Sequence, residues 1–393
     1  MFLFTIMEFK SNIVNMIKRI LEAKIKKLSH QYPVITITGP RQSGKTTLAQ
    51  KCFNNHFYCT LEDPDIREFA RIDPRGFLQQ SDKMIIDEVQ RVPDLVSYIQ
   101  GIVDVADTPG HFILTGSHQF ELTNVISQSL AGRTAVVKLL PFSIEELKED
   151  VELDELLYRG FYPRIIDKKL NPTEALSFYT NTYLEKDLRE IKEIKNLAQF
   201  ESFLKVCAGL VGQILNKNRI ANDIGVDNKT VDSWLSVLQA SYIIFLLPPH
   251  FKNFRKRLVK APKLYFYDIG LASYLLGIKK KEHLISHPLK GALFENLVIS
   301  EKLKGYYNKV ENPPFYYFRD HVGNEVDLLE DKGTSISTYE IKLSKTLSQN
   351  IFKGLDFYKK LNPDNNESYL IYNGDIKTVR YSHHCIPFLQ RKD

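Results

Sequence analysis

The chain has 393 residues, with 53 Lys and Arg against 47 Asp and Glu and a formal net charge of +6 at pH 7. A chain of this length exceeds one hydrophobic core, so we expect two or three domains. The near balance of charge excludes a uniformly basic nucleic-acid-binding protein and leaves only local basic patches for that role.

Cysteine usage and hydropathy favour a cytoplasmic protein. The four cysteines, Cys52, Cys59, Cys207 and Cys385, lack the paired spacing of a zinc site or a disulfide framework. The longest apolar runs fall far short of the ~20 residues that a membrane helix needs. The start of the chain lacks the basic residues and the cleavage site of a secretory signal. We therefore expect no membrane partner.

The first predicted element is an amphipathic helix within residues 1–32. Apolar residues recur at helical spacing between Ile13 and Leu28, with lysines on the other side. Packing against the following domain is the expected use of such a stripe, and a membrane-surface role is the alternative.

A β-branched run, Val34 to Thr38, enters a loop with the spacing Gly-x-x-x-x-Gly-Lys-Thr, and a helical segment leaves it. This is the P-loop pattern, in which backbone N–H groups and a helix N-terminus bind phosphate oxygens. We expect ATP here, with Lys45 on the β- and γ-phosphates and Thr46 on Mg²⁺. The predicted ATP-binding residues are Gly39, Pro40, Arg41, Gln42, Ser43, Gly44, Lys45, Thr46 and Thr47.

Two later strands end in polar residues that suit hydrolysis. The run from Lys83 ends in Asp87 and Glu88, where Asp87 would hold Mg²⁺ and Glu88 would polarise the attacking water as catalytic base. The run from His111 ends at Thr115 and Ser117, and we expect it beside the P-loop strand, so that Thr115 contacts the γ-phosphate. A plain exit from strand to loop is the alternative for these hydroxyls.

Arg133 precedes the strand predicted from Ala135 to Leu140. Its guanidinium could approach the phosphates as a catalytic group, from its own subunit or from a neighbouring one. The alternative is a surface arginine at a helix end, where a positive charge is also favourable.

Four stretches closely resemble the prokaryotic predicted-ATPase family of the AAA+ class, whose members carry a C-terminal domain of unknown function. They are Gly39 to Leu48, Ile86 to Asp94, Leu114 to Ser117, and Leu130 to Arg133. The family usually reads Gly-Gly-x-Pro where this chain has Gly160-Phe161-Tyr162-Pro163. The resemblance implies assembly as a ring or dimer, so we expect a homo-oligomer. The sequence does not indicate which residues form the interface.

The pattern turns helical after Leu176, and Arg219 to Gln239 reads as helix, turn and helix. Asp227 or Asn228 is the predicted cap of the second helix. Two strands would flank a basic wing, as in a DNA-binding winged helix. Asp232 opposes phosphate binding, and interdomain packing is the alternative role. The predicted nucleic-acid-binding residues are Lys229, Lys252, Arg255, Lys256, Arg257 and Lys260.

The last region carries acids on three predicted elements. Glu295 lies on a helix, Asp327 on a strand, and Glu340 and Lys342 on one face of the next strand. The order resembles the PD-(D/E)XK nuclease core. Glu295, Asp327 and Glu340 would bind Mg²⁺, and Lys342 would orient the water or steady the phosphorus. A solvated strand face is the alternative.

The predicted fold class is α/β: a P-loop NTPase parallel sheet, an α-rich winged-helix domain, and a smaller α/β restriction-endonuclease-like domain. After the lead-in helix, the predicted domains span 33–168, 169–285 and 286–393. Two functions are open. The first is an ATPase-coupled nuclease acting on nucleic acid, with DNA favoured. The second is a nucleotide-switched DNA-binding or regulatory protein whose nuclease-like domain is not catalytic.

Overall fold

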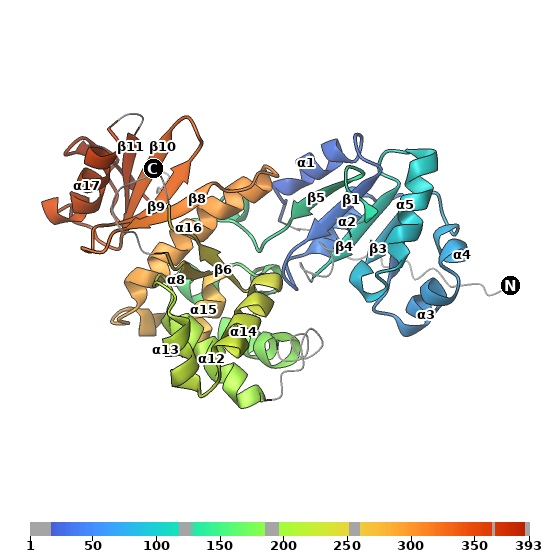
Figure 1. The fold of residues 1–393 in the computed structure, drawn as a ribbon, viewed down its shortest axis with the longest axis horizontal. Helices are drawn as coiled ribbons and strands as arrows, with labels where there is room; N and C mark the ends of the chain where they lie inside the picture. The colour runs from blue at the N-terminus through green and yellow to red at the C-terminus, as the bar shows by residue number, and fades with distance from the viewer. Residues whose placement is uncertain are drawn as a thin grey trace.

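The computed structural model describes residues 17–117, 126, 129–184, 196–250, 260–363 and 366–389. Figure 1 shows a blue-to-cyan α/β region, a green-to-yellow helical region, and an orange-to-red region with a second sheet. Helix α16 (Lys290–Asn308) extends from the second sheet toward the first region.

The first region is built on a parallel five-stranded sheet in the order β2-β3-β4-β1-β5. Its strands are β1 (Val34–Thr38), β2 (Phe57–Thr60), β3 (Met84–Asp87), β4 (Phe112–Gly116) and β5 (Thr134–Lys138). Its helices are α1 (Leu21–Leu28), α2 (Lys45–Cys52), α3 (Pro64–Ile72), α4 (Pro74–Leu78), α5 (Leu95–Ala106) and the 3-10 turn η1 (Val89–Arg91).

Successive residues of each central strand serve two separate cores. Val34 and Leu114 pack with α3, α4 and α5, whereas Ile35 and Ile113 pack with α1 and α2. Strands buried on both faces read as continuous apolar runs, because successive side chains point to opposite faces. The predicted parallel sheet, with β4 beside the P-loop strand β1, is confirmed.

The helical region leads into a two-stranded hairpin. Its helices are α7 (Ile144–Leu147), α8 (Leu153–Arg159), α9 (Pro163–Asp167), α10 (Pro172–Tyr179), the π-helix η2 (Thr180–Leu184), α12 (Leu197–Gly209), α13 (Lys217–Ile224), α14 (Asn228–Ala240), α15 (Ile269–Leu275) and the 3-10 turn η3 (Lys281–Leu284). Strands β6 (Ile244–Leu247) and β7 (Lys263–Phe266) pair antiparallel. Asp227 caps α14, as predicted.

Gly160 fixes how this region folds back on itself. A Cβ at Gly160 would lie 2.4 Å from Asp268 Oδ1 and 2.8 Å from the Gly270 nitrogen, so only glycine permits this approach. Asp268 also accepts a hydrogen bond from the Phe161 N–H at 2.8 Å. Helix α8 therefore packs with α15, although we assigned residues up to 168 to the ATPase domain.

The C-terminal sheet has the order β12-β13-β11-β10-β9-β8. Its strands are β8 (Phe315–Arg319), β9 (Glu325–Asp331), β10 (Ile336–Lys342), β11 (Asn366–Tyr372), β12 (Thr378–Arg380) and β13 (His383–Pro387), with η4 (Gln349–Phe352) and α17 (Lys353–Leu361). Strand β10 runs parallel to β11 and antiparallel to β9. The segment at His383 is a paired strand with a buried histidine.

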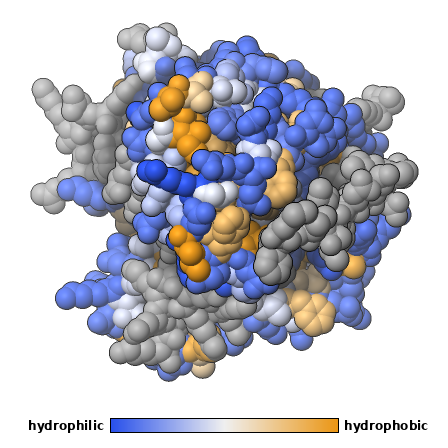
Figure 2. Space-filling model, turned by 90° about the vertical axis from the view of Figure 1, so that its right-hand side faces the viewer, coloured by the Kyte–Doolittle hydropathy of each residue, from blue (hydrophilic) through white to orange (hydrophobic). Residues whose placement is uncertain are grey.

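Figure 2 views the molecule from the end that carries α3, α4 and α5. Hydrophilic residues dominate this face, and hydrophobic ones form small separate areas. Ile72 of α3 and Tyr98 and Val105 of α5 are the exposed large hydrophobic side chains on those two helices. Within the described residues, no helix is long and apolar enough to cross a membrane.

Candidate functional site

The P-loop lies between β1 and α2, and its glycines are required by the backbone. A Cβ at Gly39 would lie 2.0 Å from the Leu139 carbonyl oxygen. Gly44 has a φ of +89° and is the N-cap of α2, a conformation that L side chains rarely adopt. The loop therefore follows the conformation that its sequence predicts.

Lys45 is buried at the start of α2. Its ammonium group donates to the carbonyl oxygens of Gly39 at 3.0 Å and Pro40 at 2.9 Å. The positive charge is thus held within the loop that would surround the phosphates.

Arg19, which was not predicted as a site residue, contacts the backbone of the P-loop. Its guanidinium donates to the Ser43 carbonyl at 2.8 Å and to the Leu140 carbonyl at 2.6 Å, and it pairs with Glu146 at 3.0 Å. A lone arginine in an amphipathic stripe carries no sequence signal for this role, because its partners lie up to 127 residues away.

Asp87 sits at the end of β3, where three hydroxyl groups converge on its carboxylate. Thr46 donates to Oδ1 at 2.9 Å, Thr115 donates to the same oxygen, and Tyr58 donates to Oδ2 at 3.2 Å. Burial raises the pKa of Asp87 above its usual range, against the opposing effect of the threonine hydrogen bonds. The structure thus brings Thr46, Asp87 and Thr115 together as predicted, and Tyr58 is an unpredicted fourth member.

Glu88 follows Asp87 and has a φ of +55°, in the left-handed region. Its side chain contacts different partners from that of Asp87. Its Oε2 accepts from Ser117 Oγ at 2.9 Å and from Gln90. Burial would raise the pKa of Glu88, but Lys45 and the hydrogen bond from Gln90 outweigh it, so the net pKa is lowered. The carboxylate is therefore ionised at neutral pH, the form that a general base requires.

The remaining P-loop residues occupy the loop and the first turn of α2. Arg41 pairs with Glu62 at 3.3 Å, and Gln42 has a φ of +62°. The Pro40 carbonyl accepts from Lys45, Ser43 is buried, and Thr47 is exposed on α2.

Arg133 is misplaced for its predicted role within one subunit. It precedes β5, and its carbonyl oxygen accepts from the N–H of Val34, at the first residue of β1. The P-loop leaves the other end of β1, about 13 Å away at ~3.3 Å per residue. Arg133 instead pairs with Asp104 of α5. The expectation that it reaches phosphates in its own subunit is wrong, because it stands before its strand and not after it.

The predicted basic wing falls mostly outside the described residues, which omit Lys252, Arg255, Lys256 and Arg257. Lys229 and Lys260 are exposed. Asp232, which argued against phosphate binding, pairs with Lys217 at 2.5 Å, so part of its charge is neutralised.

In the C-terminal region, β9 and β10 bring Asp327, Glu340 and Lys342 together. Lys342 Nζ lies 3.2 Å from Asp327 Oδ2 and 2.7 Å from Glu340 Oε1. The N–H of Ile341 also donates to Asp327 Oδ2 at 2.8 Å. Alternation along β10 thus places Glu340 and Lys342 on one face, as predicted.

Lys263 was not predicted, and it joins this carboxylate cluster from the hairpin. Its ammonium lies 3.3 Å from Glu295 Oε1, 2.5 Å from Glu325 Oε1 and 4.0 Å from Asp327 Oδ1. Only 2% of Lys263 is exposed. Burial lowers its pKa, but the neighbouring carboxylates, led by Glu295, outweigh this and raise it. A lysine at the start of a short apolar strand was the one signal for it.

The described residues of the cluster do not form an assembled metal site. Among the described residues, no three or more His, Cys, Asp or Glu side chains are grouped so as to hold a metal ion. The expected triad of Glu295, Asp327 and Glu340 is thus not assembled, because Lys263 and Lys342 lie between its members. However, Glu340 Oε2 is buried without a hydrogen-bond partner among the described residues, which suits a cation.

Two carboxyl groups of the cluster titrate abnormally. Burial, helped by Asp327, raises the pKa of Glu340 to about 8. Burial also raises the pKa of Glu295 to about 6, with Lys263 opposing it. The cluster holds more negative charge than its lysines neutralise, so protons compete for it.

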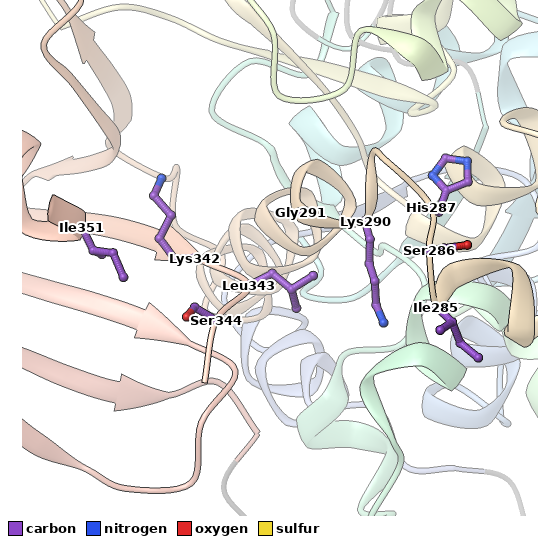
Figure 3. Close-up of a pocket in the computed structure, with 9 residues that line it drawn as sticks. All are labelled: Ile285, Ser286, His287, Lys290, Gly291, Lys342, Leu343, Ser344 and Ile351. Carbon is purple, nitrogen blue, oxygen red and sulfur yellow. The ribbon is translucent and has the colours of Figure 1, made fainter. Parts of the chain in front are cut away.

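An open groove of about 610 Å³ lies beside Lys342. Figure 3 shows Lys342 and Ile351 on one side and Ser286 and His287 on the other, with Lys290 between them. Lys290 also pairs with Asp154 at 2.7 Å. The groove lies at the end of β10, where Lys342 is the last residue of the strand.

Two uncharacterized proteins, from Mycobacterium bovis and Mycobacterium tuberculosis, are each 31% identical to this chain over 335 residues. The match covers 84% of this chain and 75% of each relative. The chain belongs to their family.

Three domain models match consecutive segments of the chain. An AAA domain matches residues 31–148, a domain of unknown function (DUF8612) matches 150–282, and another (DUF4143) matches 290–390. The first region is therefore an AAA domain with the parallel sheet and P-loop of an ATPase.

Two solved structures are also similar to this chain. A Walker-type ATPase of Pyrococcus abyssi has a TM-score of 0.46 at 16% identity, covering 66% of this chain and 96% of that one. AMPPCP-bound DnaA from Aquifex aeolicus has a TM-score of 0.30 at 17% identity, covering 56% and 86%. At these TM-scores neither structure decides the fold, which rests on the strand order.

Proposed function

We propose that this protein hydrolyses ATP at the P-loop and couples the cycle to action on nucleic acid, with DNA favoured. The observation that supports ATPase activity lies at the end of β3. There the Asp87 carboxylate accepts hydrogen bonds from the hydroxyls of Thr46 and Thr115, and the ionised Glu88 lies next to it. Thr46 and Asp87 would hold Mg²⁺, which would neutralise charge on the phosphates.

The chain's own groups divide the work of hydrolysis. Lys45 and the N–H groups of the loop bind and orient the phosphates. Glu88 accepts the proton of the attacking water, and Ser117 and Gln90 hold its carboxylate in place. Thr115 contacts Asp87, so a change at the γ-phosphate can pass to β4.

Glu88→Gln tests this assignment. The variant is expected to bind ATP as the wild type does and to hydrolyse it about 10²–10⁴-fold more slowly, because the amide cannot accept the proton. Glu62→Gln, a half-exposed acid near the same loop, is the matched control and is expected to stay near wild type. Undiminished turnover by Glu88→Gln would refute the general-base role.

A second activity, magnesium-dependent nucleic-acid cleavage, is favoured by the C-terminal cluster. Asp327, Glu340 and Lys342 lie together beside an open groove, and Glu340 Oε2 has no partner among the described residues. Glu340 and Asp327, with Glu295, would hold the metal, which would polarise a phosphodiester oxygen. Lys342 would orient the water.

DNA incubated with Mg²⁺, with and without ATP, tests the nuclease. Asp327→Ala and Lys342→Ala are expected to abolish cleavage, and Glu367→Gln on neighbouring β11 to retain it. Cleavage that persists in both alanine variants would remove this site.

A nucleotide-switched regulatory protein is the alternative, and metal titration separates it. Equal binding of Mn²⁺ by the wild type and Glu340→Ala would place the metal elsewhere and leave the C-terminal domain as a binding module.

Arg133 retains a role only across a subunit interface. Mixing Arg133→Ala with Glu88→Gln subunits is expected to restore part of the ATPase activity if a homo-oligomer forms. Mixtures that stay inactive would exclude this role.

A further inference from the structure

Lys263 comes from a different part of the chain than the acids it contacts. It begins β7, whereas Glu295 lies on α16 and Glu325 on β9. The hairpin docks on α16 through Asn296, whose side chain accepts from the Phe266 N–H at 2.7 Å and donates to the Phe266 carbonyl at 2.8 Å. Lys263 is therefore built into the cluster and is not a surface lysine that happens to reach it.

Aromatic groups enclose the lysine. Tyr265 donates to Glu295 Oε1 at 2.5 Å, so this carboxylate is held toward the hairpin. The Tyr317 ring lies 5.5 Å from Lys263 Nζ. These contacts exclude water from the ammonium and strengthen its attraction to the acids.

The charges of the cluster show what Lys263 does there. Four carboxylates, Glu295, Glu325, Asp327 and Glu340, face two ammonium groups, those of Lys263 and Lys342, and the guanidinium of Arg319, which lies 3.0 Å from Glu325. Without Lys263, Glu295 and Glu325 would lose their nearest cation. Buried charges persist only when they are paired or coordinate a metal.

We propose that Lys263 is the resident cation of this cluster and that its ammonium group excludes a divalent cation, which binds at Glu295, Asp327 and Glu340 only when Lys263 is withdrawn. This rests on the nuclease proposal for the identity of the site. The position of the hairpin then controls the C-terminal domain. When the hairpin is docked, Lys263 supplies a single positive charge to the cluster. When it is undocked, the acids can bind Mg²⁺ or Mn²⁺.

Calorimetric titration of Mn²⁺ into the full-length protein tests this inference. Lys263→Met removes the charge and keeps the length of the side chain, and it is expected to bind Mn²⁺ at least tenfold more tightly than the wild type. Lys263→Arg keeps the charge and is expected to behave as the wild type does. Lys263→Met combined with Asp327→Asn is expected to lose the gain.

Lys263→Gln serves the same purpose if the methionine variant does not fold, and Mn²⁺ is expected to raise its thermal midpoint more than that of the wild type. Equal Mn²⁺ affinity in the wild type and the Lys263 variants would overturn the inference, as would a gain that survives Asp327→Asn. DNA cleavage by Lys263→Met judges the nuclease proposal separately, because this variant can bind Mn²⁺ tightly whether or not it cleaves DNA.

Discussion

The P-loop site and the C-terminal carboxylate cluster both combine lysine with acids, but they are assembled in different ways. At the P-loop, Lys45 is held by loop carbonyls and Asp87 by hydroxyl groups, all from one edge of one sheet. In the cluster, Lys263 arrives from a separate hairpin and contacts the acids directly.

The difference shows what each region is prepared for. At the P-loop, Lys45 donates to two loop carbonyl oxygens, and its charge helps to lower the pKa of Glu88. In the cluster, two lysines pair directly with the carboxylates, so the acids are occupied from within the chain. A site of the second kind depends on how the hairpin docks on the C-terminal domain.

The pH dependence of unfolding is expected to show the largest effect, and it belongs to the cluster. The pKa of Glu340 is raised from 4.5 to about 8 in the folded protein. The folded state therefore binds this proton more tightly than the unfolded state, and stability falls as pH rises from 4.5 to about 8. The loss is at most about 5 kcal/mol.

Denaturant unfolding of the wild type and Glu340→Gln across that pH range measures this loss. The glutamine variant is expected to lose less stability as pH rises. Parallel curves for the two proteins would contradict the raised pKa.

Gly39→Ala is expected to have the next largest effect, of about 4 kcal/mol on the free energy of unfolding, because its Cβ would overlap the Leu139 carbonyl. Gly101→Ala is the control, since a Cβ there meets nothing within 4 Å and helix α5 would gain slightly. Thermal unfolding of both variants is the measurement. An unchanged midpoint in Gly39→Ala would show that the loop can shift.

Lys45→Ala is expected to weaken ATP binding by at least about 100-fold, near 3 kcal/mol, because the charge on the phosphates is lost. Lys51→Ala, on the same helix and paired with Glu22 at 3.2 Å, is the matched control. Titration with a fluorescent ATP analogue measures both. Similar affinities in the two variants would refute the phosphate role of Lys45.

Tyr242→Phe is expected to have the smallest effect and bears on the link between the two regions. The Tyr242 hydroxyl lies 2.8 Å from Thr38 Oγ1, next to the P-loop, and Tyr242 directly precedes the hairpin that carries Lys263. Its loss is expected to cost about 1 kcal/mol of stability and to weaken any effect of ATP on Mn²⁺ affinity. Tyr98→Phe, a partly exposed position, is the control.

The same Mn²⁺ titration, carried out with and without ATP, measures the coupling between ATP binding and Mn²⁺ binding. If ATP changes Mn²⁺ affinity equally in the wild type and Tyr242→Phe, the hydroxyl does not carry the link.

The P-loop site could be predicted from the sequence alone. Its residues are contiguous, and the carboxyl ends of neighbouring parallel strands share one sheet edge, so Asp87, Glu88 and Thr115 had to gather there. The same rule, applied to Arg133, would have placed it at the opposite edge, because it precedes its strand. Alternation on β10 likewise put Glu340 and Lys342 together.

The partners that come from distant parts of the chain follow from the tertiary packing and could not be predicted from the sequence. Arg19 reaches the P-loop, and Lys263 reaches Glu295 and Glu325, through the docking of one element on another. No local pattern encodes such a contact, because it depends on how whole faces pack. Whether the acids of the last domain hold a lysine or a metal was therefore beyond the sequence, and Lys263 in the hairpin is the group on which that choice depends.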